Sequence, residues 1–407
     1  MKKIILFVLI LLLSGCFNSN MNVISNTNGY LSNYVEVDNI DEDAVDMLNS
    51  FSISLYNDLL EDKNMFISPL SVYIALGMVY NGSNGLTKQE MDYVLNAGNV
   101  DLEAFNVLLR DLQYKLLSYK ETEFNIANSI WIRDTYKEHV LDDFLNNNKS
   151  YYGAFISSLK FDNTAKKTIN NWVSKNTNKK IKTAIDDDID PLTMMYLINT
   201  IYFKSDWENP FLKNNTFDSK FYSIQDTIDV QMMNKEDTLG YYIDDSLQSV
   251  LLPYKDKETA MFVILPKYSI SDIDLTKEYL NNIINSMKSN NKIVNLTMPK
   301  VKLEYEKSLV DVLKNMGMTS AFTNADFSNL SDTALQEGLC ISDVLHKTYL
   351  AIDEKGTEAA AMTKVEIKNT AIMDTIMLTI NKPYILGIID YDTNSILFIG
   401  SVFNPNN

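Results

Sequence analysis

Residues that commonly carry out enzymatic chemistry are sparse in this chain. Its 407 residues include two histidines, His139 and His346, and two cysteines, Cys16 and Cys340. A Ser-His-Asp triad would have to use one of these histidines, and neither lies near a Gly-x-Ser-x-Gly turn that would present a nucleophilic serine. No glycine motif of the kind that binds phosphate is present. The sequence therefore predicts a protein that is not an enzyme.

Metal and cofactor sites are also not indicated. No short-range combination of His, Cys and carboxylate has the spacing of a metal site. The acidic run 186–188 is interpreted as solvated loop charge, with metal binding as the second interpretation. A net charge of -17 argues against nucleic acid as a partner and against attraction to anionic lipid. Cys340 lies in an apolar run, so we expect a buried core thiol there.

The first residues resemble a targeting segment. A short positive start precedes an apolar run that ends at Cys16, and this run is too short to span a bilayer. Leu13-Ser14-Gly15-Cys16 resembles a bacterial lipobox, which implies a signal peptide over 1–15 and acyl chains such as palmitate on Cys16. The alternative is a plain secretory signal. Residues 16–40 are interpreted as a polar tether and 41–407 as one folded domain.

The segment 353–375 has an alternating pattern. From Thr357 every second residue is small or apolar, and the intervening residues are mostly charged. A period of two is typical of a strand with one buried face, yet the Ala, Glu and Lys content favours helix. The simplest interpretation is an amphipathic helix or a surface loop. The alternative is a segment that changes state.

This segment resembles the hinge and reactive loop of serpins. The matching residues are Glu354, Gly356, Thr357, Glu358, Ala359, Ala360, Ala361 and Thr363. The resemblance extends over nearly the whole chain after the first forty residues. It implies a mixed α+β serpin fold, with about nine helices around three β-sheets and an exposed reactive-centre loop. Gly356 is expected to supply conformational freedom at the base of the hinge.

Several elements of that fold can be placed from local patterns. Apolar spacing predicts helices over 41–60, 101–117 and 309–316, and Ser68 with Pro69 predicts the start of another helix. Alternation predicts a strand over 124–132, and the largely apolar stretch 196–203 predicts a central strand.

The resemblance also assigns roles to residues far from the hinge. It places His346 in a buried polar cluster with Asn199, Ser68 and Ser71 beneath the middle of the main sheet; an isolated core histidine is the alternative. It places Trp207 at the top of the central strand. It pairs Glu354 with Lys300 where the loop enters the sheet, and we interpret this ion pair as structural gating, because surface pairs alone contribute little.

The position of the cleaved bond follows from the spacing usual in the family. Counting from Glu354 predicts cleavage between Thr370 and Ala371. The interval to Pro383 is about two residues longer than is common in the family, so Ile372 and Met373 remain alternatives. Lys368 would suit a trypsin-like protease.

The resemblance implies an irreversible suicide-substrate inhibitor of serine, and also of cysteine, endopeptidases. The cleaved loop would insert into the main sheet and trap the acyl-enzyme, and Thr357→Arg would abolish trapping but not cleavage. The alternative is a non-inhibitory serpin that acts as a cell-surface binding protein. We expect a monomer without cofactor, anchored through Cys16 in the bacterial cell envelope and facing the periplasm or the exterior.

Overall fold

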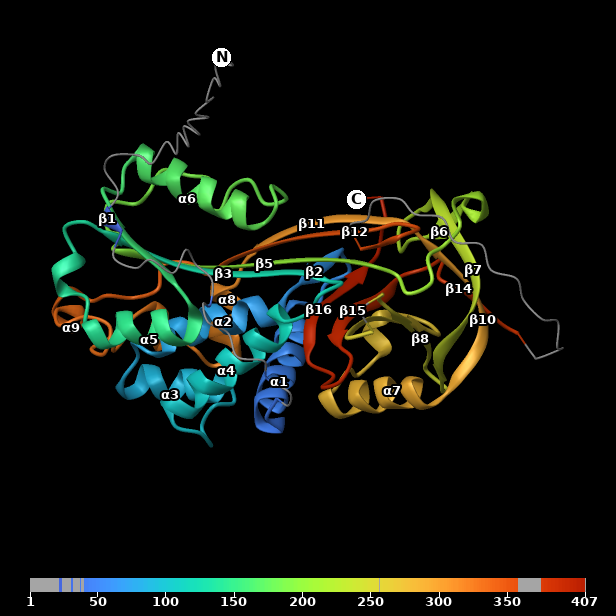
Figure 1. Ribbon diagram of the computed structural model, residues 1–407, viewed down its shortest axis with the longest axis horizontal. Helices are drawn as coiled ribbons and strands as arrows, with labels where there is room; N and C mark the ends of the chain where they lie inside the picture. Colours follow the sequence, from blue (N-terminus) through green and yellow to red (C-terminus); the bar gives the residue numbers. More distant parts are fainter. Residues whose placement is uncertain are drawn as a thin grey trace, which may run out of the picture.

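The computed structural model of the protein describes residues 40–255, 257–357 and 375–406, residues 31 and 37, and the backbone of Asn22 and Val23. Its main sheet forms a layer across the middle of the molecule, and helices lie on both sides of this layer (Figure 1). The α-helices of the described residues are α1 (Glu42–Leu59), α2 (Pro69–Tyr80), α3 (Gly85–Val94), α4 (Leu102–Leu117), α5 (Asp142–Tyr152), α6 (Asn163–Asn176), α7 (Lys277–Ser289), α8 (Val310–Met316) and α9 (Ala334–Glu337).

The main sheet contains seven of the described strands. In spatial order they are β1 (Asn22–Val23), β4 (Phe155–Leu159), β3 (Glu123–Arg133), β5 (Met195–Asp206), β13 (Gly356–Thr357), β12 (Leu345–Ile352) and β11 (Val301–Ser308). The predicted central strand is confirmed as β5, which pairs with β3 along nearly its full length. Between β5 and β12 the connection is made by the two residues of β13. The sheet therefore consists of two halves joined at one end.

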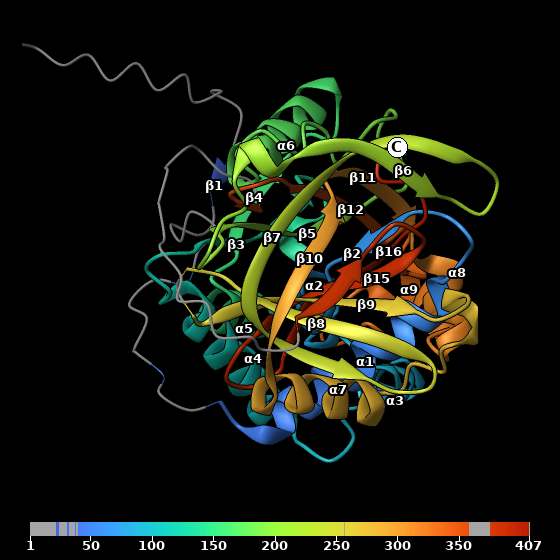
Figure 2. The same cartoon turned by 90° about the vertical axis from the view of Figure 1, so that its right-hand side faces the viewer.

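The second sheet curves around one end of the molecule (Figure 2). Its path is β14 (Ile376–Thr379), β10 (Asn291–Pro299), β7 (Thr227–Ile243), β8 (Leu247–Pro253), β9 (Thr259–Pro266), β15 (Tyr384–Asp390), β16 (Ile396–Val402) and β2 (Met65–Ile67), and β6 (Phe217–Tyr222) also pairs with β7. The long strand β7 pairs with β6 at its start, β10 in its middle and β8 at its end. The second and third sheets expected from the resemblance are thus continuous through β7, and the mixed α+β fold is confirmed.

Two apolar layers hold the main sheet between its neighbours. The larger core fills the space between the main sheet, the second sheet and the helices on that side. A smaller core lies under α6, where Trp131 of β3 packs against Trp172 with ring centroids 6.2 Å apart. Helix α6 therefore rests on the face of the main sheet that points away from the larger core (Figure 1).

Local capping signals place the helix that begins behind the main sheet. The side chain of Ser68 accepts a hydrogen bond from the backbone of Ser71, and Pro69 occupies the first turn. Helix α2 is buried along almost its whole length and ends at Tyr80. The prediction that this helix starts at Ser68 is confirmed. Its first turn lies beneath β5 and β12, where it can bond to both.

The expected environment of Cys340 is wrong. Its thiol is exposed. The apolar run around it belongs to a connection after α9 that is neither helix nor strand, so the larger neighbours Leu339 and Ile341 are half-buried while Cys340 faces solvent.

Within the described residues, no helix is both long and apolar enough to cross a bilayer.

Candidate functional site: the opening between β5 and β12

The chain enters the gap between the two halves of the main sheet at Gly356. Gly356 pairs with Asp206 of β5, and Thr357 pairs with Ser205 on one side and Ile352 of β12 on the other. A turn precedes these two residues, in which the backbone N–H of Asp353 donates to the carbonyl of Gly356 over 3.0 Å. The first residues of the predicted hinge thus already form a short middle strand. Residues 358–374 lie outside the described part of the chain.

Thr357 points into the core and is held there by an aromatic pair. Its side chain is 3% exposed, and its Oγ1 lies 2.7 Å from the hydroxyl of Tyr254. The ring of Tyr254 stacks on Trp207, with centroids 4.8 Å apart and planes 7° apart. Trp207 in turn donates from Nε1 to the carbonyl of Asp353 and from its backbone N–H to that of Lys355. Trp207 is therefore where the resemblance places it, and it bonds directly to the turn.

The reason for a glycine at 356 differs from the expected one. Gly356 does not have the left-handed backbone that favours glycine. Instead, a Cβ at this position would lie 2.2 Å from the carbonyl oxygen of Ser205 and 2.7 Å from the Cα of Asp206. Glycine is required because the hinge backbone approaches β5 too closely for a side chain.

Glu354 forms the predicted ion pair, but its carboxylate is buried. Its Oε1 lies 2.8 Å from Nζ of Lys300 and accepts a hydrogen bond from Oγ1 of Thr216 at 2.9 Å. The residue is only 4% exposed, whereas about a third of the Lys300 side chain is exposed. Burial raises the pKa of Glu354, but the bonds from Lys300 and Thr216 outweigh it and leave the pKa below its usual value. The predicted pair is therefore present, with its carboxylate in a buried position.

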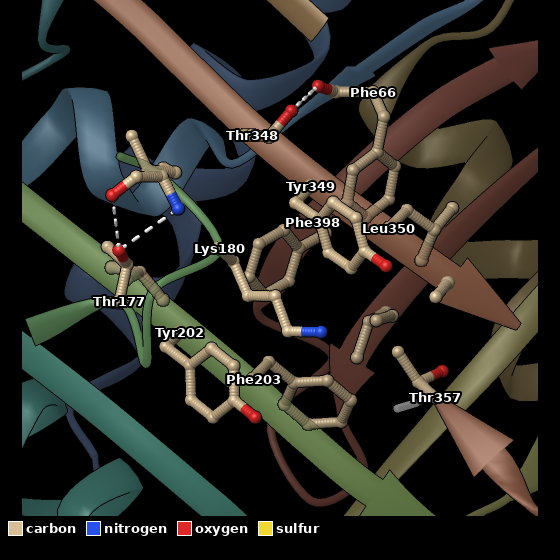
Figure 3. Close-up of a pocket in the computed structure, with 14 residues that line it drawn as sticks. Phe66, Thr177, Lys180, Tyr202, Phe203, Thr348, Tyr349, Leu350, Thr357 and Phe398 are labelled. Carbon is tan, nitrogen blue, oxygen red and sulfur yellow. Dashed lines mark hydrogen bonds between the residues drawn. The ribbon is translucent and has the colours of Figure 1, made fainter. Parts of the chain in front are cut away.

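A small cavity lies in the gap just beyond Thr357. Its volume is about 30 Å³, which is room for about one water molecule. Figure 3 shows Phe66, Phe203 and Phe398 on its wall and Thr357 at its end. The facing strand segments are 201–203 of β5 and 348–351 of β12. No backbone pairing joins these two described segments directly, so the gap is an apolar slot between two parted strands.

Beyond the cavity, the predicted polar cluster is present. Because β13 pairs antiparallel with both neighbours, β5 and β12 run parallel. Ser205 and Ile352 are level, so Asn199 and His346, each six residues earlier, are level too. His346 accepts a hydrogen bond at Nε2 from the backbone N–H of Ser68 over 3.1 Å. Burial lowers the pKa of His346 to about 4, so it is neutral near pH 7.

The other half of the cluster attaches β5 to the same helix. Ser71 donates from Oγ to Oδ1 of Asn199, and its backbone N–H donates to Oγ of Ser68 over 3.3 Å. Asn199 donates from Nδ2 to Oδ1 of Asn128 on β3 over 2.8 Å. The start of α2 thus bonds to both edges of the opening. Any movement of β5 or β12 away from the start of α2 would stretch these bonds or require other partners for the groups that make them.

Asn128 was not predicted, although its sequence context gave a signal. It is a buried amide within the apolar strand 124–132, and buried polar groups require partners. Tyr254 and Thr216 gave no such signal, because only the tertiary register brings them to the hinge.

A segment after α6, residues 177–186, crosses the opening on its outer face. Nζ of Lys180 lies 4.7 Å from the ring centroid of Tyr349 on β12 (Figure 3), and Asp186 pairs with Lys347 on the same strand. On the β5 side, the amide of Asn178 lies 3.4 Å from the hydroxyl of Tyr202. Asp186 is thus not only solvated loop charge: it attaches this segment to one edge of the opening.

The remaining predicted site residues cannot be placed. The hinge residues Glu358, Ala359, Ala360, Ala361 and Thr363 lie outside the described residues, as do the proposed cleavage positions Lys368, Thr370, Ala371, Ile372 and Met373, and Cys16. Their assignments stay predictions.

Comparisons with known proteins agree on one family. The profile for "Serpin (serine protease inhibitor)" matches residues 46–405. An uncharacterized serpin-like protein of Thermococcus kodakarensis is 33% identical over 377 residues, covering 89% of this chain and 86% of that protein.

Solved structures agree as well. The native state of the thermophilic serpin tengpin has a TM-score of 0.80 at 33% identity, covering 94% of this chain and 99% of that one. Human thyroxine-binding globulin, solved in complex with thyroxine, has a TM-score of 0.78 at 30% identity, covering 89% of this chain and 98% of that one.

Proposed function

The chain belongs to the serpin family of serine protease inhibitors, and we propose that it is an irreversible suicide-substrate inhibitor of serine endopeptidases, and of cysteine endopeptidases as well. The family is one of protease inhibitors rather than enzymes, and its inhibitory members act on proteases. The observation that carries the proposal is the opening between β5 and β12, which Gly356 and Thr357 already enter.

The register of β13 supports insertion of the residues that follow. Thr357 is level with Ser205 and Ile352. An antiparallel strand continued at this register would bring Ala359 level with Phe203 and Leu350. Thr357 faces the core, so the residues at 359, 361 and 363 would face it too. These are alanine, alanine and threonine, which suit a slot whose cavity has room for little more than a methyl group.

The same register would bring Thr363 to the level of Asn199 and His346. The new strand would then pass directly over the polar cluster, where a hydroxyl can bond and an aliphatic side chain cannot. Insertion would end near residue 367, level with Met195 at the start of β5. This corresponds to about ten inserted residues and a movement of about 33 Å.

Trapping would begin as an ordinary proteolytic step. The serine hydroxyl or cysteine thiol of the protease attacks the carbonyl carbon of the residue before the cleaved bond. The bond to the next nitrogen breaks, that nitrogen takes a proton from the protease, and an acyl-enzyme remains. We place this bond at Thr370–Ala371, with Lys368, Ile372 and Met373 as alternatives. Insertion would then carry the acyl-linked protease along the sheet before water can release it.

We further propose that Cys16 carries the lipid that anchors the mature chain in the bacterial cell envelope. The support is the lipobox-like run 13–16 after a signal-peptide-like segment. Mass spectrometry of the N-terminal peptide tests this directly, because an acylated Cys16 carries a large, defined mass increase.

A second candidate function is binding without inhibition. The structural likeness to thyroxine-binding globulin favours it, since that protein is described as a complex with thyroxine. Both candidates share the fold, so only the behaviour of the loop separates them.

The test is a screen of serine and cysteine proteases for adducts that resist SDS, with mass mapping of the cut. We expect an adduct with at least one protease and a cut between 368 and 373. The cut protein should also melt well above the intact one. Cleavage in this interval without an adduct and without a rise in melting temperature would favour the second candidate.

A further inference from the structure

The N-terminal segment is attached to one edge of the main sheet. The backbone of β1 pairs antiparallel with β4, with Asn22 level with Ser158 and Val23 level with Ser157. Because β3 lies on the other side of β4, β1 occupies the outer edge of the sheet. Asn22 follows Cys16 by six residues. Only a short stretch of chain therefore separates the predicted site of lipidation from the sheet.

The pairing register shows which end of the sheet this is. Ser158 is level with Ile132 of β3, and Ile132 is level with Met195, the first residue of β5. Asn22 is therefore level with the start of β5, whereas Thr357 of the hinge is level with a residue ten positions further along that strand. The two levels are about 33 Å apart. Figure 1 shows the same arrangement, with β1 and β14 at opposite ends of the molecule.

The direction of β1 indicates on which side of it the anchor lies. β1 is antiparallel to β4, β4 is parallel to β3, and β3 is antiparallel to β5. β1 and β5 therefore run in the same direction, towards the hinge. A chain followed backwards from Asn22 leads away from the hinge, and its six residues reach at most about 22 Å. A lipid on Cys16 would then enter the bilayer beside the start of β5.

Exposed apolar side chains at the same end also suit a membrane surface. Leu192 lies three residues before β5 and is 81% exposed, and Leu335 of α9 is 60% exposed. Figure 1 shows α9 at the end of the molecule where β1 lies. Large exposed apolar side chains commonly mark sites that contact a membrane or another protein. An acyl chain inserted nearby would bring these leucines to the lipid headgroups.

Resting on the proposed lipidation of Cys16, we propose that the pairing of β1 with β4 orients the anchored protein. The start of β5 faces the surface of the lipid bilayer, and the hinge end faces away from it. The hinge lies about 33 Å further from the bilayer than the paired residues of β1 do. The reactive loop is thus presented to proteases in the aqueous phase, not to proteases embedded in the same membrane.

Two thiol labels, one at each end, test this orientation. Cys340 is exposed, follows α9, and is the only thiol left once Cys16 is acylated. The label at the hinge end uses Leu212→Cys together with Cys340→Ser. Leu212 is 47% exposed and follows Phe211, whose backbone N–H donates to the carbonyl of Glu354. The acylated protein is bound to phosphatidylcholine vesicles that carry an acceptor dye on their headgroups, and energy transfer from each label is measured.

Because the two ends are about 33 Å apart, we expect transfer from Cys340 to be at least about threefold stronger than transfer from position 212. The double variant Asn22→Pro and Val23→Pro removes both N–H groups of β1 and leaves an unpaired tether, so the two transfers should come within about twofold of each other. The matched control, Asn26→Pro and Thr27→Pro, alters the same segment but spares β1 and should keep the difference. Equal melting temperatures show that the fold of each variant is intact.

Three results would overturn the orientation in the acylated protein. The first is equal transfer from both labels, or stronger transfer from position 212. The second is a difference that the β1 variant leaves unchanged, and the third is a difference that the control variant also loses. Mass spectrometry of the vesicle-bound protein separates these results from failure of the anchoring proposal. If Cys16 carries no acyl chain, the anchoring proposal fails and the orientation fails with it.

Discussion

Replacing Ala361 by arginine should prevent trapping while leaving cleavage intact. At the register of β13, Ala361 becomes level with Ile201 and Thr348, and both line the cavity of about 30 Å³. An arginine there has no room and no carboxylate partner among the cavity residues. Burying an unpaired charge costs several kcal/mol, so the strand should stop at residue 360.

The loss can be set against the gain from full insertion. An inserted strand over 358–367 would add about ten net ladder bonds, each contributing about 1 kcal/mol. Stopping at residue 360 forfeits about 6 to 7 kcal/mol of this and shortens the movement of the protease from about 33 Å to about 10 Å. The active site of the attached protease would then remain undistorted, and water would hydrolyse the acyl-enzyme at the normal rate.

The structure makes Ala361 a better position for this test than Thr357. Thr357 is already buried against Tyr254 in the uncut protein. Thr357→Arg would therefore disrupt the hinge before any cleavage, and a loss of trapping could reflect a damaged starting state. Ala361 is not part of the contact between Thr357 and Tyr254, so Ala361→Arg leaves that contact unchanged.

Glu358→Arg is the matched control. Alternation turns position 358 to the opposite face of the inserted strand, level with Lys204 and Ala351, and the chain itself carries a charged side chain there. The assay measures the fraction of cleavage events that end in an SDS-resistant adduct. We expect this fraction to fall at least tenfold for Ala361→Arg and to change little for Glu358→Arg. An undiminished adduct with Ala361→Arg would refute the register and the mechanism built on it.

Three further predictions concern the uncut protein. Gly356→Ala should destabilise the uncut protein by about 1–3 kcal/mol and so lower its melting temperature, because the new methyl group would overlap the backbone of Ser205. Calorimetry measures the midpoint of unfolding, and an unchanged midpoint would contradict the close approach. Lys300→Met should destabilise by about 3 kcal/mol, since it leaves the buried Glu354 carboxylate without its cation, whereas the paired change with Glu354→Gln should recover part of the loss. His346 has a pKa of about 4 in the folded protein, below its usual 6.5, so the unfolded chain binds more protons between these two pH values. The contribution of neutral His346 to the free energy of unfolding is therefore complete above pH 6.5 and should fall by about 3 kcal/mol by pH 4. His346→Gln should reduce the dependence of the unfolding free energy on pH between 4 and 6.5. A pH dependence identical to that of the unmodified protein would contradict the assignment.

The features predicted correctly from the residues alone are those specified by neighbours in sequence. Ser68 and Pro69 define a helix start through contacts within one turn, and the alternating residue pattern of 124–132 by itself indicates a strand. The burial of Glu354 could not be predicted in this way, because it depends on Thr216 and Lys300 arriving from other strands.

The same limit explains the other differences. The need for glycine at 356 comes from the backbone of β5 across the gap, not from the turn in which Gly356 lies. The crossing segment 177–186 gave no local signal, because charged residues in a connection look alike whether or not they meet a strand. The resemblance supplied Asn199 and His346 together, yet their equal level on parallel strands follows only from the pairing of β13.

Chain length explains why cleavage should be the trigger for insertion. Full insertion would place residue 367 at the start of β5, about 33 Å from the hinge. In the uncut chain, the nine steps from residue 367 to Ile376 at the start of β14 would then have to cover this distance, and they span at most about 32 Å. Figure 1 shows β14 beyond the hinge end of β5, so the span required exceeds the 33 Å of the insertion itself. The intact chain therefore cannot insert fully while β14 stays paired with β10, and cutting between 368 and 373 removes this restraint without breaking any bond of the second sheet.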